Sequence, residues 1–97
     1  MVVERYTSGP GPIYERAAAH GRMLPDGLRY LDSWVVADGA FDHCFQLMET
    51  DDPALFDAWL DNWRDLATFE IYPVVGSAEA AASVEVGWDG AVGGPPS

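Results

Sequence analysis

The chain has little cysteine and few basic residues. Cys44 is the single cysteine among 97 residues, so an internal disulfide and every multi-cysteine zinc site are excluded. Five basic residues face sixteen acidic ones, which gives a formal charge of −11. A polyanion repels phosphate backbones and anionic lipid surfaces, so we expect neither nucleic acid nor a membrane as a partner.

Long apolar runs are also missing. The first apolar run stops at Val3, before Glu4 and Arg5, and is too short for a secretion signal. No later run is long enough to span a bilayer. The two histidines, His20 and His43, have no third ligand in a metal-binding pattern. We therefore expect a soluble cytoplasmic protein without metal or cofactor.

The composition provides ample material for one hydrophobic core. Apolar residues make up 48% of the chain, aromatic residues 12%, and four residues are tryptophan. We expect a single domain over residues 1–84. Ser77–Ser83 predicts a short helical turn, and Val84–Trp88 could add a brief strand. Residues 85–97 form a Gly- and Pro-rich tail that we expect to be flexible.

Local patterns predict four strands and two helices. A helix starts at Pro12 and stops at Gly21, and a second starts at Asp51-Asp52-Pro53, where a carboxylate can cap it. The apolar stripe of the second helix is expected in the core and comprises Leu55, Phe56, Trp59, Leu60 and Trp63. The strands are Val2–Tyr6, a hairpin of Leu28–Val36 and Phe41–Thr50 around Asp38-Gly39, and Thr68–Val75. Pro73 indicates that the last strand lies at an edge.

This element order is the βαββαβ arrangement of a ferredoxin-like α+β fold. It predicts a four-stranded antiparallel sheet with two helices on one face. With a period of two, we expect the covered face to carry Val3, Leu31, Ser33, Val35, Phe45, Leu47, Phe69 and Ile71. The opposite face would then carry Glu4, Tyr6, Tyr30, Asp32, Trp34, Cys44, Gln46, Met48, Glu70 and Tyr72.

The second face is too aromatic to remain in contact with solvent. Tyrosine, tryptophan and methionine together would form an apolar patch that monomers rarely expose. We therefore expect a second copy to pack against it, sheet to sheet. The prediction is a homodimer with a central cavity, which is a dimeric α/β barrel.

Several segments resemble the bacterial domain of unknown function 3303 family. The resemblance is carried by residues 21–28, Asp32-Ser-Trp-Val35, residues 44–55 and residues 73–80, and it spans residues 2 to 84. It implies a fold similar to the dimeric α/β-barrel superfamily, which includes antibiotic-type monooxygenases, muconolactone isomerases and haem-degrading enzymes. The family has no activity that could be carried over to this chain.

The second face provides the candidate site. Asp32 and Glu4 are the candidate catalytic carboxylates, because a desolvated carboxylate beside an aromatic wall can bind a planar ligand or move a proton. The predicted ligand-binding residues are Tyr6, Tyr30, Asp32, Trp34, Gln46, Met48 and Tyr72. The same groups could instead satisfy one another as a structural network across the dimer interface. Arg22 could clamp a carboxylate, or pair with a structural acid such as Glu49.

Two classes of function follow. The main hypothesis is that the dimer cavity binds a small apolar or aromatic molecule. The alternative is a structural or interaction module without a ligand. A cofactor-independent monooxygenase or isomerase-like enzyme would be the catalytic version of the main hypothesis, and it rests on superfamily analogy alone.

Overall fold

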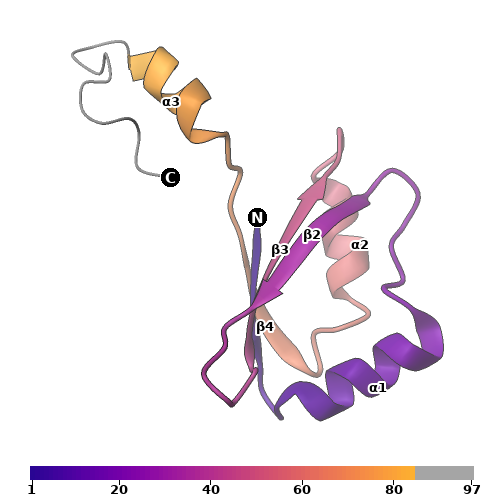
Figure 1. The fold of residues 1–97 in the computed structure, drawn as a ribbon. Helices are drawn as coiled ribbons and strands as arrows, with labels where there is room; N and C mark the ends of the chain where they lie inside the picture. The colour runs from indigo at the N-terminus through magenta and orange to yellow at the C-terminus, as the bar shows by residue number, and fades with distance from the viewer. Residues whose placement is uncertain (85–97) are drawn as a thin grey trace.

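A computed structural model describes residues 1–84 of the chain. The elements are β1 (Val2–Tyr6), α1 (Pro10–His20), β2 (Arg29–Val35), β3 (His43–Glu49), α2 (Ala54–Leu60), β4 (Ala67–Ile71) and α3 (Ser77–Val84). The four strands form one antiparallel sheet in the order β2-β3-β1-β4, with α1 and α2 on the same side of it (Figure 1). The predicted ferredoxin-like α+β fold is confirmed. Except for Val84, which ends α3, the predicted extra strand and the predicted tail lie outside the described residues.

Proline and glycine set the ends of α1. The helix begins at Pro10, two residues before the predicted start, and contains Pro12 in its first turn. Gly21 follows the last helical residue with a φ of 70°, and its N–H donates to the carbonyl of Ala17. A residue with a Cβ rarely adopts this backbone conformation, so the predicted glycine stop is confirmed.

The start of α2 also follows the sequence signal. The N-cap residue of the helix is Pro53, and the carboxylate of Asp52 before it accepts a hydrogen bond from the N–H of Ala54 at 3.0 Å. The helix itself ends at Leu60, whereas the apolar stripe continues through a turn to Trp63. Trp59, Leu60 and Trp63 are all buried, which confirms that the inner part of this stripe belongs to the core.

A β-bulge in β2 interrupts the simple alternation of its side chains. Tyr30 pairs with Met48, but Leu47 is paired with Asp32, so Leu31 is an additional residue in this strand. An extra residue moves every later side chain to the other face. Tyr30 therefore packs against the core, whereas Trp34, which simple alternation would place on the same face, is half exposed.

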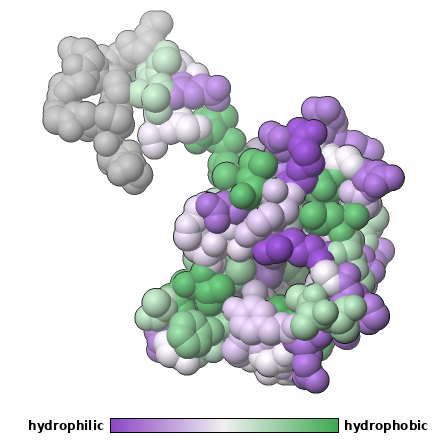
Figure 2. All heavy atoms as spheres, turned by 45° about the vertical axis from the view of Figure 1, so that its right-hand side comes forward, coloured by the Kyte–Doolittle hydropathy of each residue, from purple (hydrophilic) through white to green (hydrophobic). Residues whose placement is uncertain are grey.

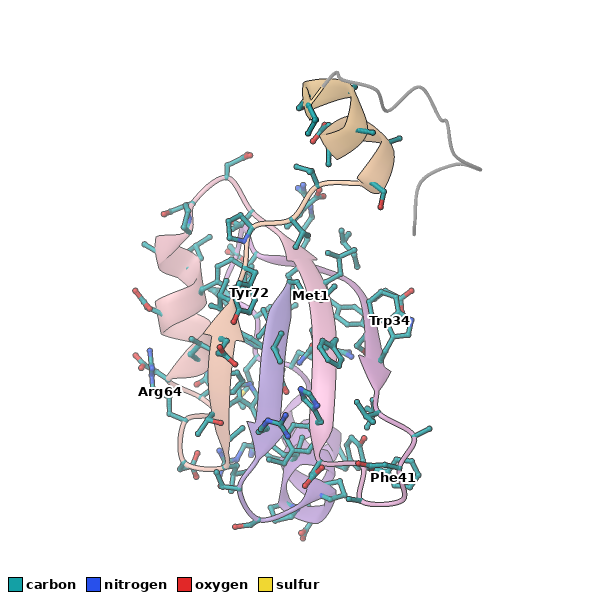
Figure 3. The ribbon with its side chains drawn as sticks, turned by 90° about the vertical axis from the view of Figure 1, so that its left-hand side faces the viewer. Met1, Trp34, Phe41, Arg64 and Tyr72 are labelled. Carbon is teal, nitrogen blue, oxygen red and sulfur yellow. The ribbon has the colours of Figure 1, made fainter. Side chains whose placement is uncertain are left out.

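The helices cover the face of β1 and β3 that was predicted to be bare, whereas Ser33, Val35 and Phe69 lie under the helices as predicted. The buried strand residues are Val2, Glu4 and Tyr6 from β1, Cys44, Gln46 and Met48 from β3, and Ala67 from β4. They pack with Trp59 and Trp63, while Val3, Phe45 and Leu47 lie on the opposite, bare face, which Figure 3 views. The predicted face assignment is therefore wrong for β1 and β3. Alternation shows which residues share a face, but it does not show which face the helices cover.

β4 is an edge strand, as predicted, but it is shorter than predicted. It ends at Ile71, and Pro73 follows it outside the ladder. The chain then leads to α3, which has no buried residue and projects away from the sheet (Figure 1). Val74 and Val75 are exposed along this segment, where hydrophobic side chains gather in Figure 2. Among the described residues, no helix is long and apolar enough to cross a membrane.

Candidate functional site

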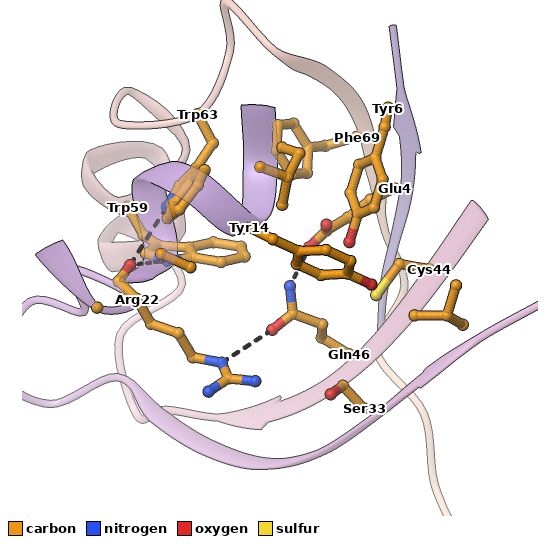
Figure 4. A pocket seen from close by; sticks show the side chains of 14 residues that line it. Glu4, Tyr6, Tyr14, Arg22, Ser33, Cys44, Gln46, Trp59, Trp63 and Phe69 are labelled. Atoms are coloured by element: carbon orange, nitrogen blue, oxygen red, sulfur yellow. Dashed lines mark hydrogen bonds between the residues drawn. The ribbon is translucent and has the colours of Figure 1, made fainter. Parts of the chain in front are cut away.

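A cavity of about 220 Å³ lies between the sheet and the two helices α1 and α2. Its walls are largely apolar and include five aromatic side chains, with a small number of polar groups among them (Figure 4). The lining residues are Glu4, Tyr6, Ile13, Tyr14, Ala17, Gly21, Arg22, Ser33, Val35, Cys44, Gln46, Trp59, Trp63 and Phe69. An apolar cavity with a few convergent polar groups is the usual form of a small-molecule site.

Glu4 contributes a buried carboxyl group to this cavity. β1 places it on the helix-covered face, where only 3% of the residue is exposed. The amide nitrogen of Gln46 donates a hydrogen bond to its Oε1. Burial raises the pKa of Glu4 to about 7, although hydrogen bonds from Gln46 and Tyr6 and the charge of Arg22 oppose this rise. Glu4 is therefore poised to gain or lose a proton near neutral pH.

Arg22 brings a positive charge to the same cavity. Its Nε donates a hydrogen bond to Oε1 of Gln46 at 3.4 Å, and its guanidinium lies 3.5 Å from the centroid of the Tyr30 ring. The predicted pair with Glu49 is wrong, because Glu49 accepts its hydrogen bonds from Arg29, directly across the β2-β3 ladder. The Gln46 amide thus connects Arg22 to Glu4.

The backbone around Arg22 is held by side chains of α2 and the following turn. The carbonyl of Arg22 accepts hydrogen bonds from the indole N–H groups of Trp59 at 2.9 Å and Trp63 at 3.2 Å. The amide of Asn62 donates to the next carbonyl, that of Met23, at 3.4 Å. Met23 has a φ of 58°, which is uncommon for a residue with a side chain. These contacts fix where the Arg22 side chain leaves the loop.

The remaining polar groups of the cavity are neutral hydrogen-bonding groups. Burial raises the pKa values of the Tyr6 hydroxyl and the Cys44 thiol, so both keep their protons. The hydroxyls of Tyr30 and Ser33 are 2.8 Å apart and share a hydrogen bond. The ring centroid of His43 lies 4.7 Å from that of Phe45 on the bare face, so it is on the opposite face from Cys44.

The structure brings only part of the predicted site together. Glu4, Tyr6 and Gln46 line the cavity, and Tyr30 and Met48 lie on the same face of the sheet. The other predicted residues lie elsewhere. The exposed carboxylate of Asp32 accepts a hydrogen bond from the neighbouring Ser33 N–H at 2.7 Å. Trp34 and Tyr72 are each 49% exposed, and neither they nor Asp32 line this cavity, so a role for these three residues in ligand binding stays a prediction.

The helices and the loop after α1 supply residues that were not predicted for the site. Tyr14 comes from α1, while Trp59 and Trp63 come from α2 and its turn. Both tryptophans belong to the predicted core stripe, which indicated packing and gave no reason to expect a cavity. Their indole N–H groups offered a signal, because a buried indole needs a hydrogen-bond acceptor. Within residues 1–84, no group of three His, Cys, Asp or Glu side chains is placed to hold a metal ion.

The fold and the cavity define a ferredoxin-like α+β domain with a small, partly open cavity between its sheet and its helices. The family model described as "Domain of unknown function (DUF3303)" matches residues 1–87. The chain therefore belongs to the DUF3303 family, which confirms the predicted resemblance. No curated protein and no solved structure matches the chain at a significant level.

Proposed function

We propose that this protein binds a small, largely aromatic molecule in the cavity beneath α1 and α2. The observation that supports this function best is the buried Glu4 carboxyl at the wall of an aromatic cavity. A carboxyl group that only filled space would weaken the fold, because its burial disfavours the charged form. Its position beside Arg22 and Gln46 is favourable if a bound molecule uses these groups.

The shape and chemistry of the cavity limit the size and the chemical class of the ligand. Trp59, Trp63 and Phe69 offer flat apolar surfaces, and ring-to-ring contact favours an aromatic molecule. A volume of about 220 Å³ suits a molecule of one or two rings and excludes a larger cofactor. The polar groups at Arg22 and Glu4 would orient one polar substituent.

The proposed cavity is not the one predicted from the sequence. That prediction placed the ligand between the sheets of two protomers. Glu4, Tyr6 and Gln46 are instead buried beneath helices of their own chain, so each protomer has its own cavity. Ligand binding through these three residues stays a proposal, at a corrected location.

A cavity-filling variant tests binding. Ala17 lines the cavity, whereas the neighbouring Ala18 is exposed on the same helix. Isothermal titration with phenol, benzamide and benzoate should detect at least one ligand for the wild-type protein. Ala17→Leu should abolish that binding, and Ala18→Leu should leave it unchanged. Absence of binding to all three compounds, or equal binding to both variants, would contradict the proposal.

We also propose that the bare face of the sheet forms a homodimer interface. This face carries Val3, Leu31, Phe45 and Leu47, which were predicted to lie under the helices, together with Trp34, which was predicted for the bare face. Leu31 is 48% exposed and Trp34 is 49% exposed. Figure 3 shows Trp34 on β2 in the view of this face. Contiguous exposed apolar surface is a mark of protein interfaces, so a second copy remains the simplest partner.

Sedimentation tests the dimer. Trp34→Asp places a charge within the proposed interface, on the edge strand β2, and should shift the protein toward the monomer. Phe41→Asp is the matched control, because Phe41 is 46% exposed on the hairpin turn away from the strands. A dimer that survives Trp34→Asp, or a monomeric wild-type protein, would rule out this interface. A stable dimer whose cavity binds nothing would favour the alternative of a structural module.

A further inference from the structure

We propose that the ligand of this cavity is a small aromatic monocarboxylate, which binds the Arg22 guanidinium while a protonated Glu4 donates a hydrogen bond to it. This inference rests on the proposed binding function and names its ligand class. It also assigns a role to the carboxyl group of Glu4 and the guanidinium of Arg22, which contact with an aromatic ring alone would not use.

Arg22 is placed to receive an anion. Three of the five arginines form ion pairs with acidic residues, namely Arg16 with Asp65, Arg29 with Glu49 and Arg64 with Asp61. Among the described residues, Arg22 forms no such pair, although the chain is strongly acidic. Its hydrogen bond to Gln46 is long, and its guanidinium lies over the Tyr30 ring. A planar guanidinium with unused N–H groups suits the two oxygens of a carboxylate.

The backbone contacts of Arg22 support a binding role. Two indoles from α2 and its turn hold the Arg22 carbonyl, and Met23 beyond it adopts a left-handed backbone conformation. Strained backbone held in place by several contacts is found mainly at functional sites. A guanidinium whose base is fixed loses less conformational entropy when it binds a ligand.

Glu4 is the only carboxyl group that lines the cavity within residues 1–84. The ionisable groups around it are the Tyr6 hydroxyl on β1, the Tyr14 hydroxyl on α1, the Cys44 thiol on β3 and the Arg22 guanidinium in the loop. The contributions of β2, α2 with its turn, and β4 are Ser33, Val35, Trp59, Trp63 and Phe69, none of them acidic or basic. An ionised Glu4 would therefore repel a bound carboxylate directly, and a protonated Glu4 would donate to it.

Arg22 and Glu4 are coupled through one amide. Gln46 donates through Nε2 to Glu4 and accepts through Oε1 from Arg22. The charge of Arg22 helps to keep Glu4 ionised in the empty cavity. A carboxylate bound to Arg22 neutralises that charge and adds repulsion, so Glu4 takes up a proton on binding. Binding of the acid should therefore weaken as the pH rises above neutrality.

The rest of the ligand follows from the walls and from the net charge. Aromatic side chains favour a ring next to the carboxylate. The formal charge of −11 and the presence of one guanidinium in the cavity disfavour ligands with several negative charges. A single carboxylate on one small ring system satisfies both conditions.

The experiment compares benzoate with benzamide, which have similar shapes but differ in charge. Isothermal titration at about pH 6 and about pH 8, in buffers of different ionisation enthalpy, measures both affinity and proton uptake. Benzoate should bind more tightly than benzamide at the lower pH. At the higher pH its binding should be accompanied by uptake of one proton and should weaken by about tenfold per pH unit. Benzamide should show neither effect.

Two variants assign the roles. Glu4→Gln keeps a hydrogen-bonding group of the same size without the charge, so benzoate binding should become independent of pH and tighter than wild type at about pH 8. Arg22→Gln should reduce benzoate affinity to that of benzamide. Should Glu4→Gln fail to fold, the proton uptake of the wild-type protein still decides the role of Glu4.

Each result has a distinct meaning. If benzamide and benzoate bind equally and Ala17→Leu abolishes both, the cavity is a binding site but the preference for a carboxylate is wrong. If benzoate binds more tightly without proton uptake, the role of Glu4 is wrong. If neither compound nor phenol binds, the proposed function fails together with this inference.

Discussion

Each face of the sheet holds some residues that ordinary expectation would place on the other face. The face beneath the helices holds a carboxyl group and a carboxamide among its apolar core residues, while the bare face displays valine, leucine, phenylalanine and tryptophan among charged residues. Glu4 is 3% exposed and Trp34 is 49% exposed. A polar group can be buried when its partners are buried with it, and an apolar group remains exposed when its partner is another molecule. The contrast therefore separates a site inside the chain from a surface for association.

The largest expected effect compares tryptophans from the two faces. Trp59→Ala should lower the free energy of unfolding by about 3–5 kcal/mol. The substitution creates a cavity in the core beneath α2 and removes a hydrogen bond to the Arg22 carbonyl. Trp34→Ala should change the stability of the monomer by less than about 1 kcal/mol. Urea denaturation at low protein concentration measures both.

Measuring stability at several protein concentrations gives a further test of this comparison. If Trp34 lies in a dimer interface, the effect of Trp34→Ala should grow as the wild-type protein is concentrated, because dimerisation stabilises the folded state by mass action. Trp59→Ala should show no such growth. If Trp34→Ala and Trp59→Ala lowered the free energy of unfolding of the monomer equally, the two faces would not differ in burial.

The next effect concerns the pH dependence of stability. Glu4 has its pKa raised from an ordinary 4.5 to about 7 in the folded protein, so the folded state holds this proton more tightly than the unfolded state. The stability that the protonated group contributes is complete below about pH 4.5, decreases as the pH rises and is lost above about pH 7. The loss should amount to about 3 kcal/mol.

Glu4→Gln isolates this contribution from the rest of the acidic chain. The variant has no proton to lose at position 4, so its stability relative to wild type should rise between about pH 4.5 and about pH 7. Glu70→Gln on the exposed side of β4 is the control and should show no such rise. A constant difference between Glu4→Gln and wild type across this range would contradict the proposed burial of an ionisable carboxyl.

The smallest energetic effect is expected at two neighbouring positions of β3. Cys44 is 4% exposed and burial raises the pKa of its thiol, so it should react slowly with a thiol reagent in the folded protein. A cysteine at position 43, in the double variant His43→Cys/Cys44→Ala, should react much faster because it lies on the bare face. Similar rates at both positions would contradict the assignment of the two faces.

Much of the fold could be predicted because local signals determine the elements. Pro12, Gly21 and the Asp52-Pro53 pair marked the helix ends to within a few residues, and the order of elements then restricted the topology. The β-bulge at Leu31 could not be predicted from the pattern of side chains. With or without the extra residue, each face of β2 carries an apolar residue. This extra residue moved Ser33 and Val35 to the opposite face from Leu31, and Trp34 to the opposite face from Tyr30.

The candidate site was also predicted only in part. Alternation correctly grouped Glu4, Tyr6, Cys44, Gln46 and Met48, but their polar character suggested the bare face. The decisive partners came from elsewhere in the chain. Arg22 reaches Gln46 from a loop, and the Trp59 and Trp63 indoles hold that loop. Contacts between segments this far apart in the sequence leave no periodic pattern.

The most direct test of the central claim is a ¹H–¹⁵N NMR titration of the wild-type protein with benzoate, observing the indole N–H signals of the tryptophans. Trp59 and Trp63 line the cavity, whereas Trp34 lies on the bare face. We predict saturable shifts of the Trp59 and Trp63 signals, with the Trp34 signal unchanged and the shifts absent in Ala17→Leu. Shifts confined to Trp34, or no saturable shift of any indole signal, would contradict a binding site beneath the helices.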